Sequence, residues 1–173
     1  ATIPGKDTFI GELDGSVTDR TRAIGAAFEE AGMQCIVSDN IMGVIWDKLM
    51  VNVATGAVCG ITHLPYGDMY EEEKLVACAC AAVQEGMDVA KAAGVDLTYS
   101  NPMDVLELAR AGLPKSFKPS ILQSLEKHRP TEVGVINGAV VAQGAKYGVP
   151  TPVNETLVAC VTGIERYIRE YVD

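Results

Sequence analysis

The sequence predicts a mainly α protein, in which an all-helical bundle follows a short strand–helix–strand unit. Three observations predict this fold class. Strand-like segments occur only before residue 40, and apolar residues recur at helical spacing from residue 41 to the C-terminus. Gly and Pro separate the helical segments. With 173 residues, of which 48% are hydrophobic, the chain is long enough to bury a core.

Residues 1–40 form the strand–helix–strand unit. Residues 8–13 have strand character, residues 16–31 carry apolar residues at helical spacing, and residues 35–37 form a second short strand. Ser16 and Asp19 resemble a capping box, and Gly32 stands where a glycine often ends a helix. Because two short strands make a poor sheet by themselves, this unit is expected to be the C-terminal remnant of a larger α/β domain.

Residues 41–173 are expected to form a second, helical domain. Gly94 and Gly148 are typical residues for ending two of its helices, and Thr151 followed by Pro152 is typical of a helix start. No internal repeat is visible. The apolar period predicts helices over residues 41–59, 71–93, 103–111, 119–127, 133–147 and 152–171.

Charge and composition argue against several classes of function. A net charge of −9 disfavours binding to nucleic acid or to an anionic membrane surface. No apolar run reaches the roughly 18 residues of a membrane span, and no signal peptide is visible, so a cytoplasmic location is expected. The cysteines lack the spacing of a disulfide framework or zinc site, so no metal is expected. We expect all five to be reduced core residues: Cys35, Cys59, Cys78, Cys80 and Cys160.

The few polar residues of the segment 41–59 carry information, because the segment is apolar nearly all round, as in a buried helix. The helical period places Lys48, Asn52 and Thr55 on one narrow face. Burying a lysine among apolar residues costs free energy unless its ammonium group contacts an anion or reaches water. Two interpretations stay open here: Lys48 extends to solvent while Asn52 bonds a carbonyl, or the two residues form a binding site.

A second polar group surrounds residues 118–132. Ser120 follows Lys118-Pro119, and Thr131-Glu132 precedes a segment rich in small residues. Thr131 is placed to cap a helix that begins at residue 133, and the helix dipole would favour Glu132 in its first turn, which is an alternative to a functional role. The two histidines, His63 and His128, are expected to face solvent.

Several segments resemble the C-terminal half of ketopantoate reductases, and the match covers almost the whole chain. Residues 10–15 are similar to a strand near the end of that family's nucleotide-binding domain. The resemblance implies that residues 1–40 are the remnant of a Rossmann-type nucleotide-binding domain. It implies that residues 41–173 form a helical substrate-binding and dimerisation domain like the C-terminal domain of 6-phosphogluconate dehydrogenase. The other matching segments are residues 46–52, 129–133, 136–141 and 148–157.

The resemblance also implies a reaction, the NADPH-dependent reduction of 2-dehydropantoate to pantoate in pantothenate biosynthesis. Lys48 matches the family's general acid, and Asn52 and Ser120 match residues that hold the substrate. Glu132 matches an active-site glutamate that helps to place the substrate or the nicotinamide ribose. This chemistry agrees with the helix pattern, because hydride transfer to a ketone builds negative charge on its oxygen, which an ammonium can neutralise and protonate.

The chain departs from the family pattern in ways that keep other functions open. Gly56 and Tyr66 stand where members that reduce ketopantoate usually carry asparagines, and Gly134 where an aspartate is common. One alternative is a paralogue that reduces another small 2-oxo acid; another is a non-catalytic helical module that dimerises. No Gly-x-Gly-x-x-Gly follows a strand, so this chain alone is expected neither to bind NADPH tightly nor to turn over.

Overall fold

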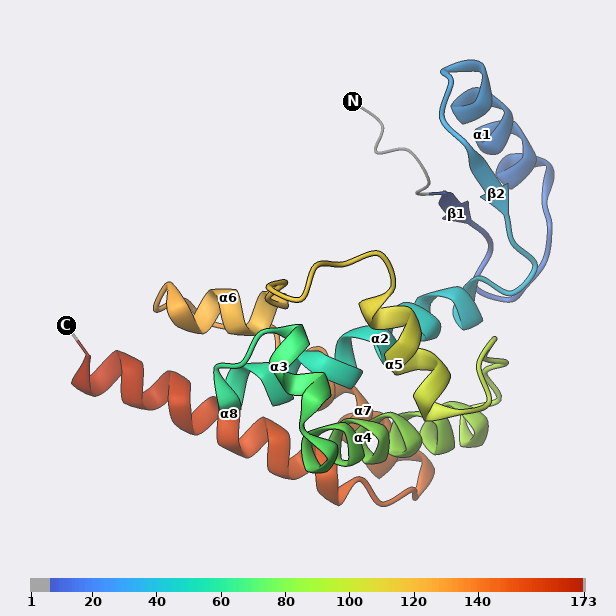
Figure 1. Ribbon diagram of the computed structural model, residues 1–173. Helices are drawn as coiled ribbons and strands as arrows, with labels where there is room; N and C mark the ends of the chain where they lie inside the picture. Colours follow the sequence, from blue (N-terminus) through green and yellow to red (C-terminus); the bar gives the residue numbers. More distant parts are fainter. Residues whose placement is uncertain (1–6, 173) are drawn as a thin grey trace.

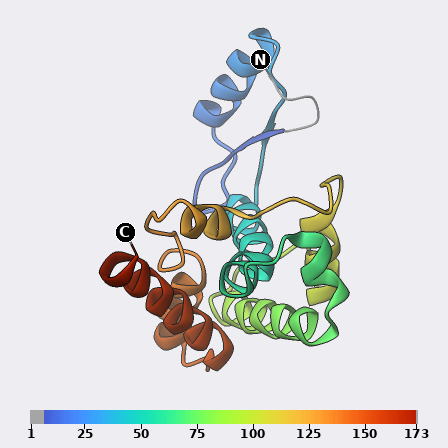
Figure 2. The same cartoon turned by 60° about the vertical axis from the view of Figure 1, so that its left-hand side comes forward.

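The computed structural model describes residues 7–172 and consists of a small strand–helix–strand unit and a larger helical body (Figure 1). The unit stands apart from the body in both views of the chain (Figures 1 and 2). It contains the strand β1 (Thr8–Ile10), the helix α1 (Asp19–Glu30) and the strand β2 (Cys35–Val37). The predicted fold class, a helical domain after a short β element, is confirmed.

The two strands pair in parallel, with Phe9 opposite Ile36, and α1 packs against β2. The predicted capping box of Ser16 and Asp19 is wrong, because the side chain of Ser16 bonds to Asp14 instead. Thr18 caps α1 through a box with Thr21. The predicted helix end is confirmed, since Gly32 follows α1 with a φ of +76°, which glycine adopts without strain.

Seven helices of the described chain form the body. Three residues separate the long helix α2 from the end of β2, and α8 is the last helix of the described chain (Figure 1). The bounds are α2 (Ile41–Thr62), α3 (Tyr66–Glu71), α4 (Glu73–Ala92), α5 (Pro102–Arg110), α6 (Ser120–Glu126), α7 (Asn137–Tyr147) and α8 (Pro152–Tyr171).

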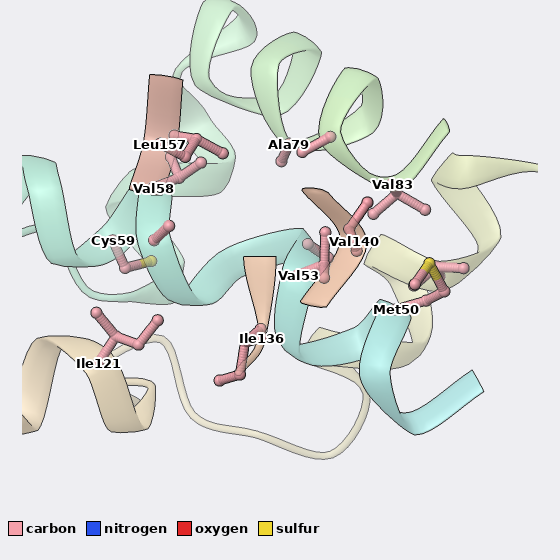
Figure 3. Close-up of a cluster of buried hydrophobic side chains, with 14 of the residues drawn as sticks. Met50, Val53, Val58, Cys59, Ala79, Val83, Ile121, Ile136, Val140 and Leu157 are labelled. Atoms are coloured by element: carbon pink, nitrogen blue, oxygen red, sulfur yellow. The ribbon is translucent and has the colours of Figure 1, made fainter. Parts of the chain in front are cut away.

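α2 is the central helix of the body, and α4, α5, α6 and α8 pack around it. Its buried face supplies Met50, Val53 and Val58 to the hydrophobic core, which Figure 3 shows in close-up. α4, α6, α7 and α8 contribute side chains to the same cluster. By length and composition α2 could cross a membrane, but more than half of that stretch is buried inside the body, as in the core helix of a soluble protein.

Glycines allow two of the helices to approach α2 closely. A Cβ atom at Gly60 would lie 2.7 Å from Cγ2 of Ile121 on α6, and one at Gly86 of α4 would lie 2.6 Å from the sulfur of Met50. Both distances are shorter than a carbon side chain tolerates. The missing side chains therefore set how tightly α4 and α6 pack on α2.

The predicted helices are confirmed in most places, with differences at two of them. The expected helix over residues 71–93 begins at Glu73, because the extended backbone of Glu72 separates it from a short helix, α3, that follows Pro65. The helix expected from residue 133 begins only at Asn137. Residues 132–136 form successive turns, so Thr131 caps a turn and Glu132 does not lie in the first turn of a helix.

The first turns of α2 are fixed to the loop that follows α4. Asn40 caps α2 by accepting a hydrogen bond from the N–H of Gly43, and its amide donates to the carbonyl of Asp96 at 2.8 Å. The carboxylate of Asp47 accepts from the N–H of Thr98 at 3.2 Å. These contacts hold the N-terminal half of α2, including the turn that carries residue 48, in a fixed place on the body.

Candidate functional site

Lys48 and Asn52 lie one turn apart on α2, and both side chains are exposed. The helical period correctly predicts that they share a face. The face is an open stripe on a helix whose other sides are largely buried, as the fully buried Met50 and Val53 show. In this chain Lys48 therefore extends to water, and the stripe presents an amine and an amide to whatever covers it.

Thr55 does not belong to this open stripe, although the helical period placed it there. Its side chain is 1% exposed, and its Oγ1 lies 2.7 Å from the hydroxyl of Tyr66, which is itself 6% exposed. The prediction fails because α3 covers this part of α2, which the sequence period cannot show. Burial raises the pKa of Tyr66, and the hydrogen bond with Thr55 offsets part of that rise.

Ser120 is the first residue of α6, and its side chain is exposed. The next residue, Ile121, is buried against Gly56, where a Cβ atom would lie 3.1 Å from the Cδ1 of Ile121. Gly56 follows Asn52 by about one helical turn. The residue next to Ser120 thus packs on the part of α2 that directly follows Asn52.

Glu132 lies in the turns between α6 and α7, with an exposed side chain. The residues around it anchor these turns, because Val133 and Ile136 are buried in the core, and Ile136 is drawn in the same cluster as Val53 and Ile121 (Figure 3). The backbone carbonyl of Glu132 accepts hydrogen bonds from two N–H groups of the following turns. Its backbone is therefore fixed, while its carboxylate faces outward.

The four candidate side chains are all exposed and have no hydrogen bond or ion pair with any other side chain between residues 7 and 172. Elsewhere on the surface, charged groups are often paired, as Lys118 is with Glu126 at 2.6 Å. The polar groups of Lys48, Asn52, Ser120 and Glu132 are thus all available to a ligand.

The histidines and cysteines are the remaining polar candidates. His63 and His128 are exposed, as predicted, and both have a positive φ at the end of a helix or turn. Cys35 and Cys59 are buried as expected, but Cys160 is exposed on α8, which corrects its assignment to the core. Within residues 7–172, no group of three or more His, Cys, Asp or Glu side chains gathers to hold a metal ion.

Two structural roles near the site were not predicted. Asp47, next to Lys48, fixes the loop after α4, and Tyr66 forms a buried pair with Thr55. Asn40 before α2 carried a recognisable capping signal. The partners of Asp47 and Tyr66 are more than ten residues away or on another element, so no local pattern could have identified them.

The chain is similar to known proteins over nearly its whole length. Residues 40–165 match the family described as ketopantoate reductase PanE/ApbA, C terminal. A 2-dehydropantoate 2-reductase of Archaeoglobus fulgidus is 31% identical over 158 residues, which make up 91% of this chain and 52% of that protein. The chain therefore spans about half the length of the curated relatives it matches.

Solved structures agree in fold. A PanE/ApbA family ketopantoate reductase from Ralstonia eutropha superimposes with a TM-score of 0.81 and 29% identity, covering 95% of this chain and 53% of that one. A D-mandelate dehydrogenase in a ternary structure with NADH and anilino(oxo)acetate superimposes with a TM-score of 0.82 and 25% identity. That alignment covers 94% of this chain and 68% of the dehydrogenase chain.

Proposed function

Because the chain belongs to the ketopantoate reductase family, whose C-terminal domain it matches, we propose that it is the substrate-binding part of a nicotinamide-dependent oxidoreductase. Residues 1–40 belong in this proposal to the nucleotide-binding domain, and residues 41–173 form the helical substrate-binding domain. The complete protein reduces the ketone of 2-dehydropantoate to the alcohol of pantoate. The observation that carries the proposal is the unpaired amine of Lys48, one turn from Asn52 on an otherwise buried helix.

Lys48 is the general acid of the proposed reaction. As hydride reaches C2, the ketone oxygen gains negative charge, and a neighbouring ammonium lowers the energy of that charge and transfers a proton to it. The Lys48 side chain has no carboxylate partner among residues 7–172, so its charge is available to a ligand. In the complete protein the nucleotide-binding domain covers the open stripe, which excludes water and strengthens this electrostatic effect.

Asn52, Ser120 and Glu132 hold the reactants around Lys48. Asn52 and Ser120 can each donate a hydrogen bond to an oxygen of the oxo acid and accept one from its hydroxyl. Glu132 accepts hydrogen bonds only, when ionised, so it suits a hydroxyl of the substrate or of the nicotinamide ribose. These roles are supported by the exposed, unpaired state of all three side chains.

The cofactor proposed for the complete protein is NADPH. When bound, a reduced nicotinamide supplies the hydride. No Gly-x-Gly-x-x-Gly pattern follows β1 or β2 to receive the pyrophosphate, so this chain is proposed to contact the nicotinamide end only. Glu132 is the residue of this chain proposed to touch the ribose.

A different 2-oxo acid is the second candidate substrate. Gly56 offers no side chain to a ligand, and the hydroxyl of Tyr66 is bonded to Thr55, so neither position supplies an amide to the hydroxyl or carboxylate of ketopantoate. The similar D-mandelate dehydrogenase was solved with anilino(oxo)acetate, an oxoacetate that carries an aromatic anilino group. These observations favour a less polar substrate side chain.

A comparison of substrates in the complete protein tests the proposal. Reduction of ketopantoate and of phenyl-substituted and aliphatic 2-oxo acids would be followed by the absorbance of NADPH and, separately, of NADH. The highest kcat/KM for ketopantoate supports the first candidate, and the highest value for another oxo acid supports the second. Failure to reduce any 2-oxo acid with either dinucleotide would leave the non-catalytic helical module as the better description.

A further inference from the structure

Tyr66 connects α2 to the segment that leads into α6. Its hydroxyl lies 2.7 Å from Oγ1 of Thr55, its ring meets the ring of Phe117 edge-on at a centroid distance of 4.9 Å, and its N–H donates to the carbonyl of Phe117 at 2.9 Å. The next N–H, of Gly67, donates to the carbonyl of Lys115 at 2.8 Å. One residue therefore contacts both segments through its backbone and its side chain.

These contacts fix the position of Ser120 from both sides. Phe117, three residues before Ser120, is held by Tyr66, which in turn is held by Thr55. Ile121, directly after Ser120, packs on Gly56. Both attachments therefore end at the same turn of α2, which directly follows the turn that carries Asn52.

Packing alone does not require the two hydroxyl groups of Thr55 and Tyr66. Both residues are buried, and a buried hydroxyl is tolerated only when it is hydrogen-bonded. An apolar pair of the same shape would fill the space without that requirement. The hydrogen bond fixes the orientation of the Tyr66 ring relative to α2. Through its contact with Phe117, the ring in turn fixes the backbone of residues 115–117.

We propose that Tyr66 is a positioning residue, which sets the distance between Ser120 and Asn52 through its bond to Thr55. The inference rests on the proposed function, in which Asn52 and Ser120 bind the oxo acid together. Tyr66 itself touches no substrate, since it is almost completely buried. Its effect reaches the substrate only through the placement of Ser120.

The test is the variant Tyr66→Phe in the complete protein, which keeps the ring and removes the hydroxyl. The KM for the oxo acid is expected to rise about tenfold, which is the size of change expected from the loss of one hydrogen bond. The KM for the dinucleotide should stay unchanged. Thr55→Val should give the same change. Tyr70→Phe is the control, because Tyr70 lies on the same helix and its half-buried hydroxyl also donates a hydrogen bond, to the carbonyl of Leu106 at 2.6 Å.

A double variant separates positioning from general destabilisation. In a Ser120→Ala background, Tyr66→Phe should raise the KM for the oxo acid no further, because the residue through which it acts is already removed. An unchanged KM in Tyr66→Phe, an equal rise in Tyr70→Phe, or additive effects with Ser120→Ala would overturn the inference while the proposed function stands. A wild-type protein that reduces no oxo acid would instead overturn the proposed function and this inference with it.

Discussion

The amine of Lys48 is the single chemical group on which the proposed reaction depends most. Lys48→Ala in the complete protein is expected to lower kcat by roughly 10² to 10⁴-fold, the usual effect of losing a general acid. Because the side chain is exposed and unpaired among the described residues, the free energy of unfolding should change by no more than about 0.5 kcal/mol. Steady-state kinetics and urea denaturation measure the two effects.

Lys74→Ala is the control for this variant, since Lys74 is also an exposed lysine on a helix but lies near the start of α4, an element that carries none of the candidate residues. It should leave both kcat and stability unchanged. A Lys48→Ala protein with the wild-type kcat would show that the amine is not the acid.

Cys59 gives a prediction about reactivity. Burial raises the pKa of its thiol to about 12, and the side chain is fully buried. Since the thiolate is the nucleophile, at pH 8 only about one Cys59 in 10⁴ is reactive in the folded chain. Iodoacetamide should therefore label the exposed Cys160 in the native protein and Cys59 only after denaturation, which peptide mass spectrometry can resolve. Equal labelling of the two in the native chain would contradict the buried position of Cys59.

At the scale of single residues, the sequence predicted which side chains share a face of α2 better than it predicted which of them are exposed. The helical period places Lys48 and Asn52 on one face, and the structure agrees. The same period places Thr55 with them, but α3 buries it. Periodicity gives the direction of a side chain on its own helix, whereas exposure depends on which other helix packs there.

At the scale of helices, long amphipathic or apolar segments were predictable and short connections were not. α8 begins and ends where the pattern predicted, at Pro152 and Tyr171. α3 was missed because six residues are too few to show a period. The start of α7 was placed too early because residues 133–136 are apolar and small, which is compatible with helix, while their hydrogen bonds form turns.

The contact between α2 and α6 gives a prediction about packing. Gly60→Ala should destabilise the fold by about 1–3 kcal/mol, because its Cβ would meet the branched side chain of Ile121, which is 1% exposed and has little room to move. Equilibrium unfolding in urea measures the change.

Gly163→Ala in α8 is the matched control, since it makes the same substitution inside a helix, and among residues 7–172 the new Cβ would meet no atom within 4 Å beyond its chain neighbours and the nearby backbone of α8. It should stabilise the protein by about 0.5–1 kcal/mol through helix propensity alone. Loss of stability in both variants would point to an effect of the substitution itself, not of the contact with α6.

At the scale of the whole molecule, the helical body is expected to fold without the strand–helix–strand unit. The two-stranded sheet has one face uncovered, as the register partners Phe9 and Ile36 are 42% and 36% exposed. Such a sheet adds little stability. A chain that lacks residues 1–38 should therefore melt cooperatively at the temperature of the whole chain, when followed by circular dichroism at 222 nm. A large drop in that temperature would show that the unit is part of the same cooperative structure.

The arrangement of the two parts could be predicted only in outline. The change from strand to helical patterns near residue 40 predicted where β2 ends and α2 begins. It could not predict that the unit stands apart from the body (Figure 2), because that depends on contacts among residues distant in sequence. The sequence pattern alone singled out Lys48 and Asn52, and the family resemblance gave these residues, Ser120 and Glu132 their expected roles. Only the structure showed that all four side chains are exposed.

Only residues 38–40 separate β2 from α2, so a small rotation of the strand-bearing half about this junction affects the geometry of the proposed active site. Lys48 lies seven residues beyond the first residue of α2, which is about 10 Å along the axis at 1.5 Å per residue. If the strand-bearing half rotated by about 6° around that junction, a group about 10 Å away would shift by about 1 Å relative to Lys48. Such a shift is enough to slow a reaction that needs aligned atoms. Asn40 binds the loop after α4 at this joint, and Asp47 binds the same loop beside Lys48, so in the proposed enzyme these two contacts hold the turn that carries the amine in place.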